Sequence, residues 1–240
     1  MFRDEGEEAM DEKLGPLHGI PIVVKDSIYQ QGKVSNFGMA YLCEYPADTD
    51  SLVLWQFIQA GAIPLVKSNT SAGDFLVHSN NEVFGDSINP IDSTRICCAD
   101  GALVASKCAP LALSSDIGSH LRVSAATSGT FSFMPTASRV TQWYDAGNPK
   151  RSRVDHFTQF QPVCGTIGNS PDDCILGFKA QVNASATDVN PFMTPCPWND
   201  EKFLLMTEEE GRNRIKVGIL QESISLPLSD ATKRAIKITE

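Results

Sequence analysis

The sequence has no long hydrophobic run and no cluster of basic residues. No apolar stretch approaches the roughly 20 residues that span a bilayer, and the acidic start of the chain lacks the apolar core of a signal peptide. The net charge is −9 and the pI is near 4.9, so we expect no nucleic-acid partner. These absences predict a cytoplasmic protein that associates with membranes at most peripherally.

The seven cysteines are an odd number and lack the regular spacing of a disulfide framework. We therefore expect free thiols in a reducing compartment. With 42% hydrophobic and 20% charged residues, the 240-residue chain has the balance of an ordinary globular protein with one sizeable core. We expect neither a metal ion nor a bound cofactor.

Short apolar segments alternate with helical patterns along the chain. A strand, a helix and a strand in succession imply a parallel pair joined by a helical crossover. We therefore predict a flexible acidic N-terminus over 1–14, then one α/β domain over 15–240 with a mixed, largely parallel sheet flanked by helices. The predicted strands are 20–24, 63–67, 109–114 and 215–220, the predicted helices are 51–60, 100–107, 171–182 and 229–238, and 137–160 and 183–212 are predicted to be irregular.

Two places combine a strand end with polar residues. The run at 109–113 leads directly into SSDIGSHLR, where backbone N–H groups at a strand end can face a developing negative charge. Lys25 closes the apolar segment IPIVV and is followed by Asp26 and Ser27. A functional lysine is one interpretation of this position, and a surface cation with a buried stem is the other.

Three segments together resemble the amidase signature family, and its fatty acid amide hydrolase branch most. GPLHGIPIVVKD resembles the segment that ends in the catalytic lysine of the family. DTDSLVLWQFIQAGAIPLVKSNTSAGDF resembles the helix, strand and loop that follow, and DGALVA with LALSSDIGSHLRVSAATSGTFSFMPT resembles the signature itself. The resemblance runs from about residue 15 to the end and covers only the N-terminal half of a family member.

The resemblance implies a serine amidase with an α/β fold and a triad of two serines and a lysine. The neutral lysine takes a proton through a bridging serine, the second serine attacks the amide carbonyl, and N–H groups of a turn hold the oxyanion. Lys25 matches the lysine, whereas His120 falls on the attacking serine and Ser119 on the preceding glycine. The turn and its flanking arginine correspond to Asp116, Ile117, Gly118 and Arg122.

The loop that carries the bridging serine departs from the family. The family form is Gly-Gly-Ser-Ser-Gly-Gly-Glu-Gly-Ala-Leu, and this chain has RICCADGAL at 95–103, with Cys97 and Cys98 inside it. Glycines permit positive φ and close backbone approach, and these replacements do not. The later Gly-Pro-Met-Ala-Arg pattern is also changed, to GTIGN at 165–169. Two of the three triad positions are therefore lost.

Three chemical alternatives remain for the altered site. Ser119 becomes a nucleophile only if the turn slips by one residue, which re-aims the oxyanion donors. A thiolate of Cys97 or Cys98 paired with His120 is chemically conceivable. His120 as a space-filling, hydrogen-bonded residue is the third alternative.

Three functional hypotheses follow. The first is an amide hydrolase acting on small or lipid amides, with impaired or absent catalysis. The second is a pseudo-amidase that binds a ligand or partner without turnover, and the third is a truncated gene product with no independent function. Because a half-length family member leaves a sheet edge uncovered, we also expect self-association through that edge.

Overall fold

The computed structural model describes residues 14–141, 162–183, 196–207, 216, 218–219 and 227–239. The chain divides into two compact units, residues 1–198 and 199–240. The described part of the second unit contains the helices α6 (Asp200–Thr207) and α8 (Asp230–Thr239). Among the described helices, none is both long enough and apolar enough to cross a membrane.

The first unit is built on a five-stranded mixed sheet with the strand order β2-β1-β5-β7-β6. Strand β1 is parallel to both of its neighbours, β2 and β5, whereas β7 is antiparallel to β5 and β6. The strands are β1 (Pro21–Lys25), β2 (Ile63–Ser68), β5 (Leu111–Asp116), β6 (Phe131–Phe133) and β7 (Val163–Gly168). Two short strands, β3 (Asn80–Asn81) and β4 (Gly85–Asp86), form a separate hairpin.

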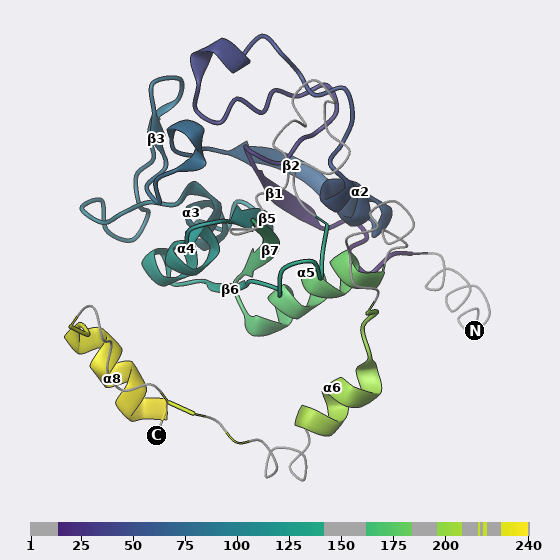
Figure 1. The fold of residues 1–240 in the computed structure, drawn as a ribbon, viewed down its shortest axis with the longest axis vertical. Coiled ribbons are helices and arrows are strands. Elements are labelled where there is room, and N and C mark those ends of the chain that lie inside the picture. The colour runs from purple at the N-terminus through teal and green to yellow at the C-terminus, as the bar shows by residue number, and fades with distance from the viewer. Residues whose placement is uncertain are drawn as a thin grey trace, which may run out of the picture. The chain divides into compact units, whose positions relative to one another are not determined.

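Helices cover both faces of the sheet (Figure 1). The helices are α2 (Leu52–Gln59) and α5 (Pro171–Asn183) on one face and α3 (Ala99–Ala105) and α4 (His120–Ser128) on the other. Side chains alternate along a strand, so Ile22 and Val24 of β1 join the cluster under α2 and α5. Val23 joins the second cluster, under α3 and α4.

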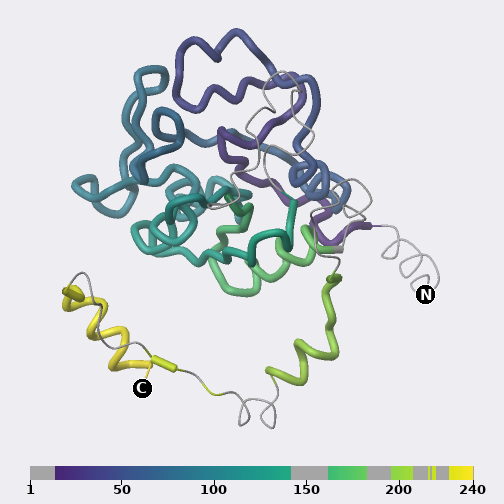
Figure 2. The backbone as a smooth tube through the Cα atoms, in the orientation of Figure 1, coloured from purple at the N-terminus to yellow at the C-terminus, as the bar shows by residue number. Residues whose placement is uncertain are grey.

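Two irregular segments connect these elements near the strand ends. Figure 2 follows the backbone from β1 through the long loop that contains the turn η1 (Ala40–Leu42) and then into α2. The second segment follows β2 and contains the turn η2 (Ala72–Asp74). Both segments begin at the carboxyl ends of parallel strands, which is where α/β sheets place their sites.

The start of α5 follows the sequence prediction closely. The Asp173 N–H donates to the Ser170 hydroxyl at 3.2 Å, and the Ser170 N–H donates to the Asp173 carboxylate at 2.9 Å. These reciprocal bonds form a capping box, which satisfies two backbone donors that the helix leaves unpaired. Asp172 and Asp173 in the first turn also complement the helix dipole.

Most predicted elements are confirmed within two or three residues, and the mixed α/β class is confirmed with them. The strands β3, β4, β6 and β7 and the helices α4 and α6 were not predicted, and α6 lies within a segment predicted to be irregular. Of the predicted strand at 215–220, the structure describes only residues 216, 218 and 219, and none of these is in a strand. The predicted irregular region 137–160 lies outside the described residues beyond 141.

Strand β7 shows why a local pattern was insufficient. Its sequence, VCGTIG, contains two glycines, which weaken strand propensity. A Cβ atom at Gly165 would lie 2.2 Å from the Phe133 carbonyl oxygen, so the glycine permits β6 to approach. The requirement for glycine at this position comes from tertiary packing and does not appear as a periodic pattern in the sequence.

Strand β2 lies at one edge of the described sheet and exposes two apolar side chains, Ile63 and Leu65. Pro64 lacks an N–H, and the pairing of β2 with β1 shifts register in this region. Both features limit the pairing of an edge with another strand. Self-association through an edge stays a prediction.

Candidate active site

The site lies where β1 and β5 end side by side. Lys25 is the last residue of β1, and Asp116 is the last residue of β5. The Lys25 side chain is only 2% exposed, and its Nζ donates to the Ser115 carbonyl oxygen at 3.1 Å. The structure therefore places the lysine that the resemblance singles out next to the turn that follows β5.

Lys25 forms a buried ion pair with Asp74, a residue of η2. The distance from Lys25 Nζ to Asp74 Oδ1 is 2.9 Å, and the Asp74 side chain is 12% exposed. The Thr70 hydroxyl donates to the same carboxylate oxygen at 2.5 Å. The amine that the resemblance assigns as the proton acceptor is therefore already engaged by a carboxylate.

The turn between β5 and α4 is held by the carboxylate of Asp116. Its Oδ1 accepts the Ser119 N–H at 2.6 Å, and its Oδ2 accepts the Leu121 N–H at 3.1 Å. Arg122 contacts the same carboxylate at 3.3 Å. Ile117 and Gly118, between these anchors, are exposed at the tip of the turn.

Ser119 keeps the backbone conformation of a glycine. Its φ is 94°, in the left-handed region where a non-glycine residue costs roughly 1–2 kcal/mol. The carboxylate of Asp116 holds the N–H groups of Ser119 and Leu121, on either side of His120, and so fixes the turn in this register. The one-residue slip that would make Ser119 the nucleophile has therefore not taken place. This geometry opposes Ser119 as the attacking serine.

His120 is the first residue of α4 and is buried. Its Nε2 lies 3.0 Å from the Leu76 carbonyl oxygen and 3.6 Å from Asp74 Oδ1. Because both neighbours are acceptors, the proton of the neutral ring belongs on Nε2. Within the described part of the chain, the buried Nδ1 meets no hydrogen-bond partner.

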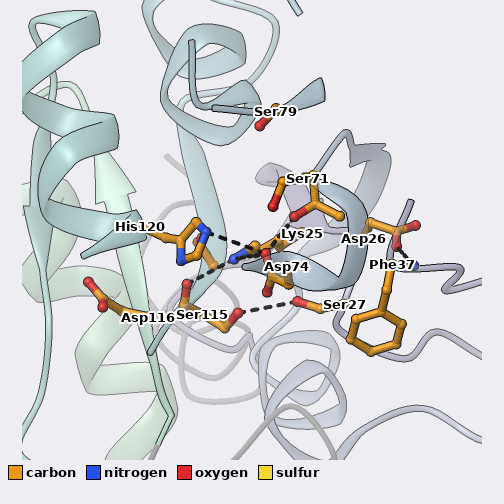
Figure 3. A network of polar contacts seen from close by, with 12 residues as sticks. Lys25, Asp26, Ser27, Phe37, Ser71, Asp74, Ser79, Ser115, Asp116 and His120 are labelled. Carbon is orange, nitrogen blue, oxygen red and sulfur yellow. Dashed lines mark hydrogen bonds and ion pairs between the residues drawn. The ribbon is translucent and has the colours of Figure 1, made fainter. Parts of the chain in front are cut away.

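Figure 3 shows how these side chains lie relative to one another. Lys25 and His120 both point toward Asp74, and each is joined to it by a dashed line. Below them, the hydroxyl oxygens of Ser27 and Ser115 lie 3.2 Å apart. Both serines are buried, so they lie beneath the site and are not exposed at its surface.

The two cysteines of the altered loop are buried, and each takes part in a hydrogen bond. The Cys97 N–H donates to His78 Nδ1 at 3.0 Å, and the Cys98 thiol donates to the Val77 carbonyl oxygen at 2.9 Å. Burial raises the pKa of Cys97 to about 11 and that of Cys98 to about 12, and neighbouring acidic groups add to both shifts. Since the thiolate is the reactive form, these values oppose a cysteine nucleophile.

A second buried carboxylate, Asp100, faces the site from α3. It accepts hydrogen bonds from the hydroxyls of Ser68 and Ser114, the latter at 2.5 Å. Burial raises the pKa of the Asp100 carboxyl, while the charge of Lys25 and the two hydroxyl bonds act in the opposite direction. Lys25 is therefore close to two carboxylates, one paired with it directly and one held by serines.

The described residues contain no group of three or more His, Cys, Asp or Glu side chains arranged to hold a metal ion. What they bring together is an ammonium, a carboxylate and an imidazole beside a rigid turn. This arrangement can bind and orient a polar group. At the position of the attacking serine, it offers an imidazole in place of a hydroxyl.

Comparisons with known proteins identify the fold. The family model described as Amidase matches residues 3–240. The chain belongs to the amidase family. It is similar to an amidase of Gibberella moniliformis, with 29% identity over 195 residues that make up 78% of this chain and 36% of that protein.

Two further relatives come from the fatty acid amide hydrolases. The fatty-acid amide hydrolase 1 of Sus scrofa is 26% identical over 193 residues, which cover 79% of this chain and 32% of that protein. A solved fatty acid amide hydrolase structure matches with a TM-score of 0.67 and 25% identity, over 78% of this chain and 33% of the other. The chain spans less than half the length of the curated relatives it matches.

The amidase resemblance located Lys25, the turn and His120 but not their partners. Asp74 was missed because it lies in a loop without periodicity, and nothing in its sequence context couples it to a lysine 49 positions earlier. Asp100 was missed because it appeared as one residue of a short helix. Ser115 belongs to the predicted polar stretch, and its position directly before Asp116 was the available signal.

Proposed function

We propose that this chain is an amidase-family hydrolase domain that recognises linear amides, with strongly impaired turnover. The observation that carries the proposal is the pairing of Lys25 with Asp74 at 2.9 Å, next to a histidine at the nucleophile position. Family membership supports amide recognition. The ion pair and His120 support impaired catalysis, because the lysine that would accept the proton is engaged by a carboxylate and the attacking hydroxyl is absent.

The apolar surface near the site supports a preference for lipid or aryl amides. Phe75 and Leu76 follow Asp74 directly and are 87% and 68% exposed. Ile117, on the turn, is 52% exposed. An amide with an apolar body can cover these side chains while its carbonyl faces the turn.

The expected loss of rate is large. In other serine hydrolases, a site without its nucleophile retains only about 10³–10⁴-fold acceleration over water, which comes from binding and the oxyanion donors. Here the N–H of Ser119 is already bonded to Asp116, so one turn donor is committed. We therefore expect an aryl amide to be hydrolysed with less than this roughly 10³–10⁴-fold acceleration over water.

A fluorophosphonate, which labels activated serines, tests the proposal. The wild type, Ser119→Ala and the double variant Cys97→Ala/Cys98→Ala are treated in parallel, and amide turnover is measured alongside. We expect no stoichiometric labelling of any of the three. Labelling of the wild type that disappears in Ser119→Ala would establish Ser119 as a nucleophile and overturn the proposal.

A non-catalytic amide-binding protein is the second candidate, and the same ion pair favours it. Calorimetric titration with a long-chain primary amide separates the two. Saturable binding with no product after prolonged incubation supports the second candidate. Slow release of carboxylic acid and ammonia above the buffer rate supports the first.

A further inference from the structure

Two hydrogen-bond donors and a nearby imidazole, from different parts of the fold, lie around one carboxylate oxygen. Lys25 Nζ, from the end of β1, lies 2.9 Å from Asp74 Oδ1. The Thr70 hydroxyl, from the loop after β2, donates to it at 2.5 Å, and His120 Nε2, from the start of α4, lies 3.6 Å away. A cation and a hydroxyl that both contact one carboxylate oxygen, with an imidazole beside them, have the chemistry of a carboxylate-binding site.

The segment that delivers the Asp74 carboxylate is held by polar contacts rather than by apolar packing. Gly73 and Asp74 have φ values of 66° and 60°, two left-handed residues in succession. A Cβ atom at Gly73 would lie 2.7 Å from the ring of Phe75, so a glycine is needed there. Phe75 and Leu76 themselves remain largely exposed.

Two contacts hold this segment against the site. Asp74 pairs with Lys25, and the Leu76 carbonyl oxygen accepts from His120 Nε2 at 3.0 Å. The two side chains that the family places at the centre of the chemistry are thus both engaged by the same short stretch of chain. Residues 73–76 occupy the site as a tethered ligand would.

We propose that Lys25 and Thr70, with His120 beside them, form a site for a small carboxylate anion, and that Asp74 occupies it as an internal ligand. The segment 73–76 is then an internal plug of this site, and a free carboxylate of the acetate or propionate class takes the place of the Asp74 carboxylate when that side chain is absent. The site requires no amide turnover. A positive fluorophosphonate result would therefore leave this proposal standing while it overturned the previous one.

Rescue by a free anion tests the site directly. Asp74→Gly removes the carboxylate, leaves room beside Lys25 and tolerates the positive φ of this position. Asp74→Asn removes the charge but fills the same space, and it serves as the matched control. Thermal unfolding of the wild type and both variants is followed in sodium acetate and in sodium chloride of equal ionic strength.

We expect acetate to raise the unfolding midpoint of Asp74→Gly saturably, by about 2–4 °C above the chloride value, as a ligand that binds only the folded state does. The wild type and Asp74→Asn should respond to the two salts alike. Adding Lys25→Met to Asp74→Gly should abolish the acetate effect. An equal response of Asp74→Gly to both salts, or a response that survives Lys25→Met, overturns the proposal.

A second measurement covers the case in which Asp74→Gly fails to fold. Trace acetylation by acetic anhydride, followed by mass spectrometry, reports the accessibility of each lysine in folded Asp74→Asn and in the wild type. We expect Lys25 labelling to rise about tenfold when the plug loses its charge. Lys67 is the internal control, because its Nζ donates to the Ile28 carbonyl oxygen and the Ser35 hydroxyl instead.

The outcome of the labelling experiment is decided by the ratio of the two lysines. A rise at Lys25 with Lys67 unchanged supports a plug that opens locally. Equal rises at both lysines indicate general unfolding, and an unchanged Lys25 indicates that Asp74 does not hold the segment. Either of these results contradicts the proposal.

Discussion

Two lysines at the ends of neighbouring strands are held in different ways. In the pairing of β1 with β2, Lys25 lies opposite Ser68 and Lys67 lies opposite Val24, so their side chains belong to opposite faces of the sheet. Lys25 is paired with the carboxylate of Asp74 at 2.9 Å. Among the residues that the structure describes, the hydrogen-bond acceptors of Lys67 Nζ are both neutral: the Ile28 carbonyl oxygen at 2.6 Å and the Ser35 hydroxyl at 2.7 Å.

The two amines therefore have different electrostatic surroundings. Burial lowers the pKa of Lys67 to about 8, and the more distant charge of Asp26 opposes this only in part. Lys25, the lysine that matches the family's proton acceptor, has a direct counter-ion instead. A buried lysine close to the expected catalytic position is therefore not sufficient for a base, because here its amine is engaged by a carboxylate at 2.9 Å.

Replacing Lys25 should have the largest effect on stability. Lys25→Met leaves the Asp74 carboxylate without its cation, and breaking a buried pair from one side costs about 3–5 kcal/mol. In Lys67→Met the Ile28 carbonyl oxygen still accepts from the Ser35 hydroxyl, at 3.2 Å, so we expect a cost of at most about 1 kcal/mol. Urea unfolding of both variants at neutral pH measures the difference. Equal costs would show that the two lysines are energetically alike.

Lys67 should be the one that gives a pH-dependent stability. Its pKa falls from 10.5 to about 8 on folding, so between these pH values the unfolded chain holds a proton that the folded chain has released. The free energy of unfolding of the wild type relative to Lys67→Met should therefore rise from about pH 8 to about pH 10.5, by about 2–3 kcal/mol. Unfolding curves of both proteins across this range measure the effect.

Subtracting the free energy of unfolding of Lys67→Met from that of the wild type separates the titration of Lys67 from that of the cysteines. Cys97 and Cys98 have raised pKa values in the folded state, so their contribution to stability falls as the pH rises above 9. This loss is common to the wild type and Lys67→Met and cancels in the difference. A difference that stays flat from pH 8 to 10.5 would contradict a weakly basic Lys67.

The same contrast explains what the sequence could predict. The apolar strand that ends at Lys25 and the helices over 51–60 and 171–182 are local patterns, and each was predictable. The turn from Asp116 to Arg122 could be located because the resemblance spans it without a gap. His120 and the altered loop at 95–101 were also visible as departures from the family form.

The ion pair at the centre of the site could not be predicted in this way. Whether Lys25 is a base depends on Asp74, which reaches it from a loop with no periodicity and two left-handed residues. The pairing is set by how that loop folds back, which is a tertiary event. Sequence reasoning also gave no reason to single out Lys67, because its low pKa comes from burial beside neutral acceptors.

Replacing Asp100 should have the smallest effect on the free energy of unfolding. The size of that effect shows whether Asp74 or Asp100 is the principal counter-ion of Lys25. Both Asp100 oxygens accept from serine hydroxyls, and burial raises the pKa of this carboxyl above 3.8. A folded pKa above the unfolded value means that its stabilising contribution is complete below about pH 4 and is lost as the pH rises through the folded pKa. An amide at this position has no such loss, and the rotatable hydroxyls of Ser68 and Ser114 can pair with it.

We therefore expect Asp100→Asn to change the free energy of unfolding by less than about 1 kcal/mol at neutral pH. Relative to the variant, the wild type should be most stable in acid and should lose this advantage as the pH rises. Urea unfolding at pH 4 and pH 7 measures both quantities. If Asp74 is the principal counter-ion of Lys25, the stability loss in Asp100→Asn should be much smaller than the loss in Lys25→Met. A loss of about 3–5 kcal/mol in Asp100→Asn would assign that role to Asp100 and make the close contact with Asp74 the weaker interaction.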